Sequence, residues 1–219
     1  MAAESTNLAL FDYFARGGVF MWPLLLCSLV GVALIIYKIV AFAAANRGGE
    51  QLVDEVVSLT RNGDLLGAAA TAGSSQLPVA GVLSAMLATR PRTREALRAE
   101  GQEAGERQLA QLEYGLPTLS TISTIAPLLG FLGTVSGMIR AFEAIAHQGM
   151  GDPGVVAAGI GEALITTATG LIVAIPCFVA FSYLVGRVNA IGMGMELAGN
   201  RLVQAVAEEV AADEAQVTA

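Results

Sequence analysis

A single carboxylate, Glu162, stands near the head of a long apolar stretch of the chain. Residues 153–186 form 34 consecutive positions in which Glu162 is the one charged side chain. A carboxylate within the hydrocarbon of a bilayer costs a few kcal/mol, and such a group commonly marks a path for ions or protons. The stretch is too long to be buried entirely, so Glu162 could equally lie at the membrane surface and cap the helix. Position alone leaves both roles open.

Hydroxyl groups accompany this carboxylate. At 100° per residue, Glu162, Thr166 and Thr169 share one face of a helix. In the stretch 114–142, Thr134 shares a face with further serine and threonine residues. A row of hydroxyls predicts a polar wall that holds water along an ion pathway. The alternative is that each hydroxyl only bonds a backbone carbonyl in the preceding turn of its own helix.

Small residues follow a second stripe on the same two stretches. Such stripes let two helices approach closely, and two helices that each carry one suit a ring of identical subunits. Prolines inside the stretches free backbone carbonyls, which neighbouring helices or water must then satisfy. The residues predicted to govern helix packing are Gly130, Gly133, Gly137, Gly170, Pro127 and Pro176.

Composition indicates a membrane protein. Of 219 residues, 54% are hydrophobic and 14% are charged, whereas a soluble domain has about 25% charged residues. Three stretches, 17–37, 114–139 and 163–186, carry no charge over at least 21 residues each, and a spanning helix needs roughly 20. We predict an all-α membrane protein whose three transmembrane helices cross the lipid bilayer and carry long cytoplasmic helical extensions.

The same composition disfavours several other functions. The formal charge of −7 argues against a nucleic-acid partner. One histidine and two cysteines, scattered along the chain, provide no metal-ligand cluster. The histidine lies outside the predicted spans, so a Ser/His/Asp arrangement is not available there. Neither an enzyme nor a cofactor is expected.

Basic residues near the span ends predict the orientation. They follow the first span, precede the second and follow the third, which places the insert and the C-terminus in the cytoplasm and the N-terminus outside it. The predicted parts are an amphipathic N-terminus (1–16), a first span (17–45), a cytoplasmic helical insert (46–113), a second span (114–142), an outer loop (143–154), a third span (155–186) and a C-terminal helix and tail (187–219).

Local signals predict how the insert is built. Asp64 is expected to begin one of its helices, and Thr93 another. The second of these helices is expected to continue into the second span as far as His147. Without a break it would have 55 residues and a length of roughly 80 Å.

Two basic side chains at the span ends receive simple roles. Lys38 is expected to snorkel from the end of the first span to the membrane surface. Arg140 is expected to pair with Glu143, which follows it by three residues on the same helix.

Two motifs closely resemble the signature of a known family. They are APLLGFLGTVSGMIRAF (126–142) and GIGEALITTATGLIVAIP (159–176), and they resemble the MotA/TolQ/ExbB proton-channel family. Residues 14–38 resemble the first span of its ExbB-like members. The resemblance covers all three spans in order. Three spans favour ExbB or TolQ over the flagellar stator protein MotA.

The resemblance implies a motor in the bacterial inner membrane, with the N-terminus in the periplasm. By family, five copies form a homo-oligomeric ring, a pentamer, around a dimer of a single-span ExbD/TolR-type partner whose membrane aspartate carries protons. Proton motive force would then drive work on a TonB/TolA-type protein, for transport across the cell envelope or its maintenance. The alternatives are a stator of a gliding or flagellar-type motor, or a non-conducting membrane scaffold.

The resemblance also implies pore positions: Thr134, Thr167 and Glu162. Thr167 lies about 140° from Glu162 around the helix, so the helical periodicity and the family pattern disagree about which threonine shares a face with the carboxylate. We follow the family for Thr167. Which of Thr166, Thr167 and Thr169 faces the axis stays open, as does the choice between protons and sodium ions.

Overall fold

The computed structural model describes residues 13–45, 48–88, 93–148 and 153–217, and their regular structure is helical. The chain divides into two compact units. The spanning unit comprises Met1–Tyr37 and Gly115–Tyr183, and the polar unit comprises Lys38–Tyr114 and Leu184–Ala219. The N-terminal prediction for residues 1–16 lies largely outside the described residues.

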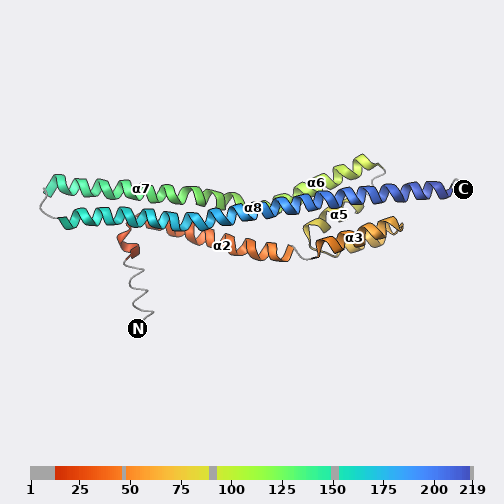
Figure 1. The fold of residues 1–219 in the computed structure, drawn as a ribbon, viewed down its shortest axis with the longest axis horizontal. Helices are drawn as coiled ribbons and strands as arrows, with labels where there is room; N and C mark the ends of the chain where they lie inside the picture. Colours follow the sequence, from red (N-terminus) through yellow and green to blue (C-terminus); the bar gives the residue numbers. More distant parts are fainter. Residues whose placement is uncertain (1–12, 46–47, 89–92, 149–152, 218–219) are drawn as a thin grey trace, which may run out of the picture. The chain divides into compact units, whose positions relative to one another are not determined.

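The spanning unit is built from three long helices. These are α2 (Met21–Ala45), α7 (Leu116–Gln148) and α8 (Pro153–Val217), of which α2 and α8 continue into the polar unit. Each contains a stretch long and apolar enough to cross a membrane, so the prediction of three candidate spans is confirmed. In Figure 1, α7 and α8 run antiparallel, side by side, with α2 along them.

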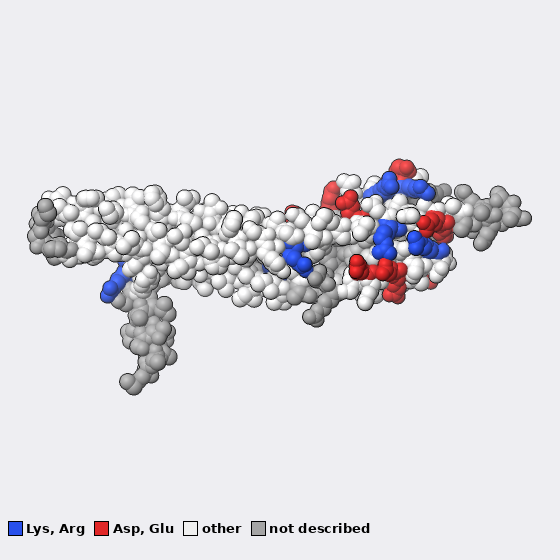
Figure 2. Space-filling model, in the orientation of Figure 1, with Lys and Arg blue, Asp and Glu red and all other residues white. Residues whose placement is uncertain are grey.

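Large apolar side chains cover the outer surface of this unit. Trp22 on α2 is 66% exposed, Leu128 on α7 is 62% exposed and Ile172 on α8 is 67% exposed. A surface so apolar is typical of a protein whose surroundings are lipid or other spans. The charged side chains gather instead over the polar unit (Figure 2).

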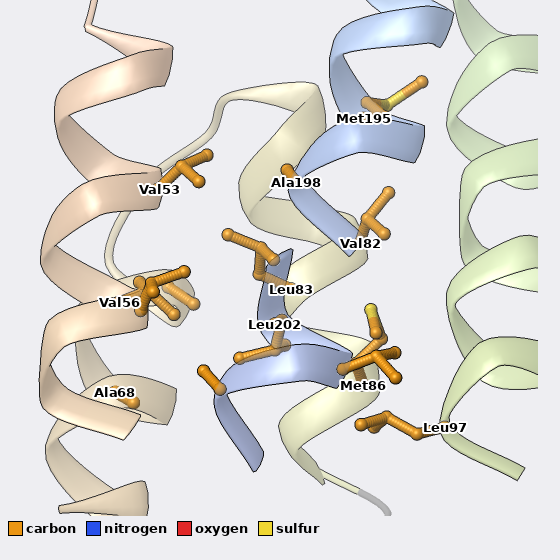
Figure 3. Close-up of a cluster of buried hydrophobic side chains, with 14 of the residues drawn as sticks. Val53, Val56, Ala68, Val82, Leu83, Met86, Leu97, Met195, Ala198 and Leu202 are labelled. Atoms are coloured by element: carbon orange, nitrogen blue, oxygen red, sulfur yellow. The ribbon is translucent and has the colours of Figure 1, made fainter. Parts of the chain in front are cut away.

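Four helices and the C-terminal part of α8 form the polar unit. The four are α3 (Gly49–Arg61), α4 (Leu65–Gly73), α5 (Pro78–Ala88) and α6 (Arg94–Glu113). Val56, Leu83, Met86 and Leu202 belong to its buried core, and their side chains converge in Figure 3. Two ion pairs at the surface, Arg61–Glu208 (3.0 Å) and Arg201–Asp54 (2.6 Å), join α3 to α8.

Both helix starts predicted in the insert are confirmed. The Asp64 carboxylate accepts a hydrogen bond from the backbone N–H of Gly67 at 2.8 Å. The Thr93 hydroxyl accepts one from the N–H of Ala96 at 3.2 Å. Each satisfies an N–H group that the first helical turn would otherwise leave without a partner.

The prediction of one unbroken helix from Thr93 to His147 is wrong, because the chain turns once within this range. Helix α6 ends at Glu113, and α7 begins at Leu116. Between them Tyr114 adopts φ −50° and ψ 129°, and Gly115 adopts φ +81°. Glycine enters that left-handed region without strain. Gly115 therefore permits the turn that separates α6 from α7.

Two other boundaries differ from expectation. The outer loop is shorter than 143–154, because α7 continues to Gln148 and α8 begins at Pro153. The C-terminal tail expected within 187–219 is also shorter than predicted, because α8 is helical to Val217. Residues 143–148 and 200–217 contain no glycine or proline, which lets α7 and α8 run on through polar sequence, and Pro153 is tolerated in the first turn of α8, where its missing N–H is not needed.

Candidate functional site

Glu162 forms an ion pair with Arg140, which joins α8 to α7. The Glu162 side chain is 12% exposed and that of Arg140 is 48% exposed. Arg140 also donates to the Ser136 hydroxyl at 3.2 Å. The expected partner of Arg140 was Glu143 on its own helix, and the structure corrects this: the side chain reaches across to α8. A charge this enclosed requires a partner, and Arg140 is that partner.

The turn before α2 closes over the same carboxylate. Gly18 adopts φ +68°, and a Cβ at this position would fall on the Glu162 carboxylate, 2.7 Å from its Cδ atom. A side chain would therefore be both strained and obstructed here. Residues Arg16, Arg140 and Glu162 line a surface hollow of about 510 Å³ together with small residues of α8. Three segments of the chain thus meet at one carboxylate.

Two of the predicted threonines, Thr166 and Thr169, donate to carbonyls of their own helix. Thr166 is fully buried, and its hydroxyl donates within α8, at 3.0 Å from the Ala163 carbonyl and 3.1 Å from that of Glu162. Thr169 donates to Ile165 at 2.8 Å. Ile165 packs against the cluster of Met21, Leu24, Ala126 and Ala174, so Thr169 lies on the flank of α8 that faces α2.

Thr167 behaves differently. Its hydroxyl lies 3.2 Å from the Ala163 carbonyl of its own helix and 3.3 Å from the Gly130 carbonyl of α7. Among the described hydroxyls of α7 and α8, this is the one that bonds the other helix. One O–H can donate to either carbonyl, so the Thr167 oxygen keeps acceptor capacity for a further partner such as water.

Thr134 lies on the same seam. It follows Gly130 by four residues, which is one turn or about 6 Å along the axis, and its hydroxyl donates to the Phe131 carbonyl at 2.6 Å. Around α7 it lies on the side of the α8 contact opposite to α2, as Thr167 does around α8. Both are half-buried. We call these two residues the seam threonines.

The stripe of small residues holds α7 to α8 within one chain. A Cβ added to Gly130 would lie 2.9 Å from the Thr166 carbonyl oxygen, and one on Gly133 would lie 2.5 Å from Thr166 Cβ. On Gly137 and Gly170 it would lie 2.6 Å from the carbonyl oxygens of Gly159 and Ala126. All four glycines are buried. The glycine surface that we expected to pack one subunit against another is therefore occupied by the contact between α7 and α8 of the same chain.

Helices α7 and α8 run through the two prolines that were predicted to loosen them. Pro127 lies inside α7 and Pro176 inside α8. Pro176 is exposed, and neither proline interrupts its helix. A proline removes one hydrogen bond of the preceding turn, so each leaves a local weakness in the helix.

Periodicity in the sequence missed the role of Lys38. Its side chain is buried, and Nζ donates to the Leu112 carbonyl at 2.7 Å. The expected snorkelling lysine is therefore turned inward. The one available signal was the proximity of a cation to the end of an apolar run, which predicts a charge near a boundary and not its partner.

Comparison with known proteins places these features in a family. Residues 74–197 match the MotA/TolQ/ExbB proton channel family. An ExbB-like biopolymer transport protein of Synechocystis sp. is 36% identical over 180 residues, which cover 80% of this chain and 70% of that protein. An ExbB homolog of Methanothermobacter thermautotrophicus is 33% identical over 183 residues, 81% of this chain and 63% of the relative. The Tol-Pal system protein TolQ of Haemophilus influenzae is 43% identical over 88 residues, 40% of this chain and 39% of TolQ.

The matched region includes the ion pair and both seam threonines, and it spans more than half of the 219 residues. The similarity to the Synechocystis protein extends over most of both chains. The chain belongs to the MotA/TolQ/ExbB proton channel family, and its relatives include ExbB-like biopolymer transport proteins.

Proposed function

We propose that this chain is the proton-channel subunit of a motor in the bacterial inner membrane, a transport component rather than an enzyme. Five copies surround a dimer of a single-span ExbD/TolR-like partner, with the N-terminus in the periplasm and the C-terminus in the cytoplasm. Proton flow along the ring drives work on a TonB/TolA-type protein. Family membership supports the assignment to a proton channel.

The seam threonines are the observation that carries this proposal. Hydroxyls in apolar spans commonly bond a carbonyl of their own helix, so the position of each hydroxyl and its further partners decide its role. Thr167 is shared between two helices, and Thr134 lies one turn from that shared bond on the same flank. Half-buried hydroxyls on the flank away from α2 can hold water for a proton relay without themselves gaining a charge.

The ion pair has a separate role in the proposal. Glu162 and Arg140 form a fixed pair of opposite charges, and the hollow beside them opens to the surface. They set the electrostatic field at the outer mouth, and the seam threonines hold water deeper in the span. One proton crossing 100 mV releases about 2.3 kcal/mol, so several protons supply useful mechanical work.

The test replaces both seam hydroxyls and measures proton movement. Thr134→Val with Thr167→Val keeps the shape of each side chain and removes its oxygen. Reconstituted with its partner subunit in liposomes, the double variant is expected to lose partner-dependent proton uptake while the complex still assembles. Thr169→Val is the matched control, because it removes one hydroxyl from the α2 flank of the same helix, and uptake is expected to persist.

Normal proton uptake in the double variant would refute the assignment and favour a scaffold whose polar residues serve assembly alone. Loss of uptake in the Thr169→Val control would place the water path on the flank that faces α2. Replacing the proton gradient by a sodium gradient in the same liposomes identifies the transported ion.

A further inference from the structure

Lys38 is the single lysine of the chain, and it occupies an unusual place for one. It belongs to the candidate span Met21–Phe42, yet its relative exposure is 4%. Nζ donates to the Leu112 carbonyl oxygen at 2.7 Å and lies 5.8 Å from the ring centroid of Phe42, one turn further along α2. An ammonium group is stable in such surroundings only when it is well partnered, so the contact with Leu112 is a structural necessity.

The acceptor of this bond lies where a helix ends. Leu112 is in the last turn of α6, which stops at Glu113. The last four carbonyls of a helix have no partner within the helix. A cation at a helix C-terminus satisfies such a carbonyl and is also favoured by the helix dipole. Lys38 therefore caps α6 from another helix, at the position where the chain turns.

The turn itself supplies little restraint. Tyr114 is extended and 75% exposed, and Gly115 adopts φ +81°. Glycine gains conformational freedom on release from such a position, so the turn needs an external hold if α6 is to end at one fixed residue. The Lys38–Leu112 bond, within the polar unit, provides that hold.

We propose that Lys38 is a positioning residue that fixes the end of α6 and thereby the point where the chain passes into α7. The chain passes between its two units at Tyr37–Lys38 and at Tyr114–Gly115, and again in α8. One hydrogen bond thus ties together the polar-unit ends of two of these three connections. This last step rests on the proposed function: a ring that does mechanical work needs rigid connections between its spanning and polar units.

Hydrogen–deuterium exchange of the full chain in its reconstituted complex tests the proposal. Lys38→Met keeps the length of the side chain and removes its donor. The amides of the last turn of α6 and of the Tyr114–Gly115 turn are expected to exchange at least about tenfold faster, because a charge-assisted hydrogen bond is lost. Chymotryptic cleavage after Tyr114 is expected to accelerate in parallel. Ile39→Met, at an exposed neighbouring position, is the matched control and should leave both rates unchanged.

Lys38→Arg separates positioning from general loss of stability. The guanidinium restores a cationic donor, so the exchange rate is expected to return toward that of the parent chain. Unchanged exchange at the end of α6 in Lys38→Met would overturn the proposal. So would a uniform rise over all helices that Lys38→Arg does not reverse.

A measurement on the unaltered chain covers the case in which Lys38→Met does not fold. An amine-reactive acylating reagent should modify Lys38 at least about tenfold more slowly in the folded chain than in the same chain unfolded by denaturant, because Lys38 is buried and hydrogen-bonded in the fold. Equal acylation rates of Lys38 in the folded and the unfolded chain would overturn the proposal. Exchange does not depend on proton transport, so the Thr134→Val/Thr167→Val variant should keep the parent rates at the end of α6, and a failure of one proposal is distinguishable from a failure of the other.

Discussion

In the spanning unit α7 and α8 meet through glycines, whereas the helices of the polar unit meet through large aliphatic side chains. Gly170 allows its helix to approach so closely that a Cβ would lie 2.6 Å from the Ala126 carbonyl oxygen. In the polar unit Leu83 and Leu202 are completely buried. Lipid tails are as apolar as leucine, so spans associate through close backbone packing rather than through a hydrophobic driving force. The polar unit, whose surface carries charged side chains, gains from burying aliphatic surface.

The largest effect is expected in the polar unit. Leu83→Ala leaves a cavity among the side chains of Val56, Met86 and Leu202. The free energy of unfolding should fall by about 2–5 kcal/mol. Denaturant titration of the full chain in detergent, followed by hydrogen exchange of α3 to α6, measures this. A loss confined to the spanning unit would contradict the contrast between the two kinds of packing.

A smaller effect is expected from adding one methyl group to the spanning unit. Gly170→Ala forces α8 away from the backbone of α7 and should lower the free energy of unfolding by about 1–3 kcal/mol. Gly105→Ala in α6 is the matched control, because a Cβ at Gly105 meets nothing within 4 Å. That control should stabilise the helix by about 0.4–1 kcal/mol. If both substitutions changed the free energy of unfolding equally in the same denaturant titration, close backbone packing at Gly170 would not explain the effect.

The smallest effect is expected at the ion pair. Arg140→Gln leaves the enclosed Glu162 carboxylate without its cation, whereas Glu162→Gln leaves an arginine that is half exposed to solvent. The first variant should therefore be the less stable of the two, by about 1 kcal/mol. Thermal unfolding of both variants in the same detergent makes the comparison. The opposite order of stability would show that Arg140, and not Glu162, is the more enclosed charge.

Much of the fold could be predicted because it depends on local signals. Uncharged runs identified the three candidate spans, and the caps at Asp64 and Thr93 followed from side chains that accept hydrogen bonds from the next turn. The break at Gly115 was missed, although a glycine stood there. Its positive φ depends on how the chain leaves α6, which the periodicity of the sequence does not record.

The candidate site was harder to predict, for a physical reason. A helical wheel gives the faces of one helix and not what each face meets. Thr166 and Thr167 are adjacent in sequence, yet Gly133 encloses the first and α7 shares a hydrogen bond with the second. Lys38 was expected to snorkel to the membrane surface and Arg140 to pair with Glu143, yet each bonds a residue distant in sequence. Long side chains reach such partners, and a single sequence does not show them.

Three segments of the spanning unit pack around the carboxylate of Glu162. The turn at Gly18, Arg140 of α7 and the first turns of α8 each touch the same group. One side chain therefore lies against the turn that leads into the first span, the end of the second span and the beginning of the third.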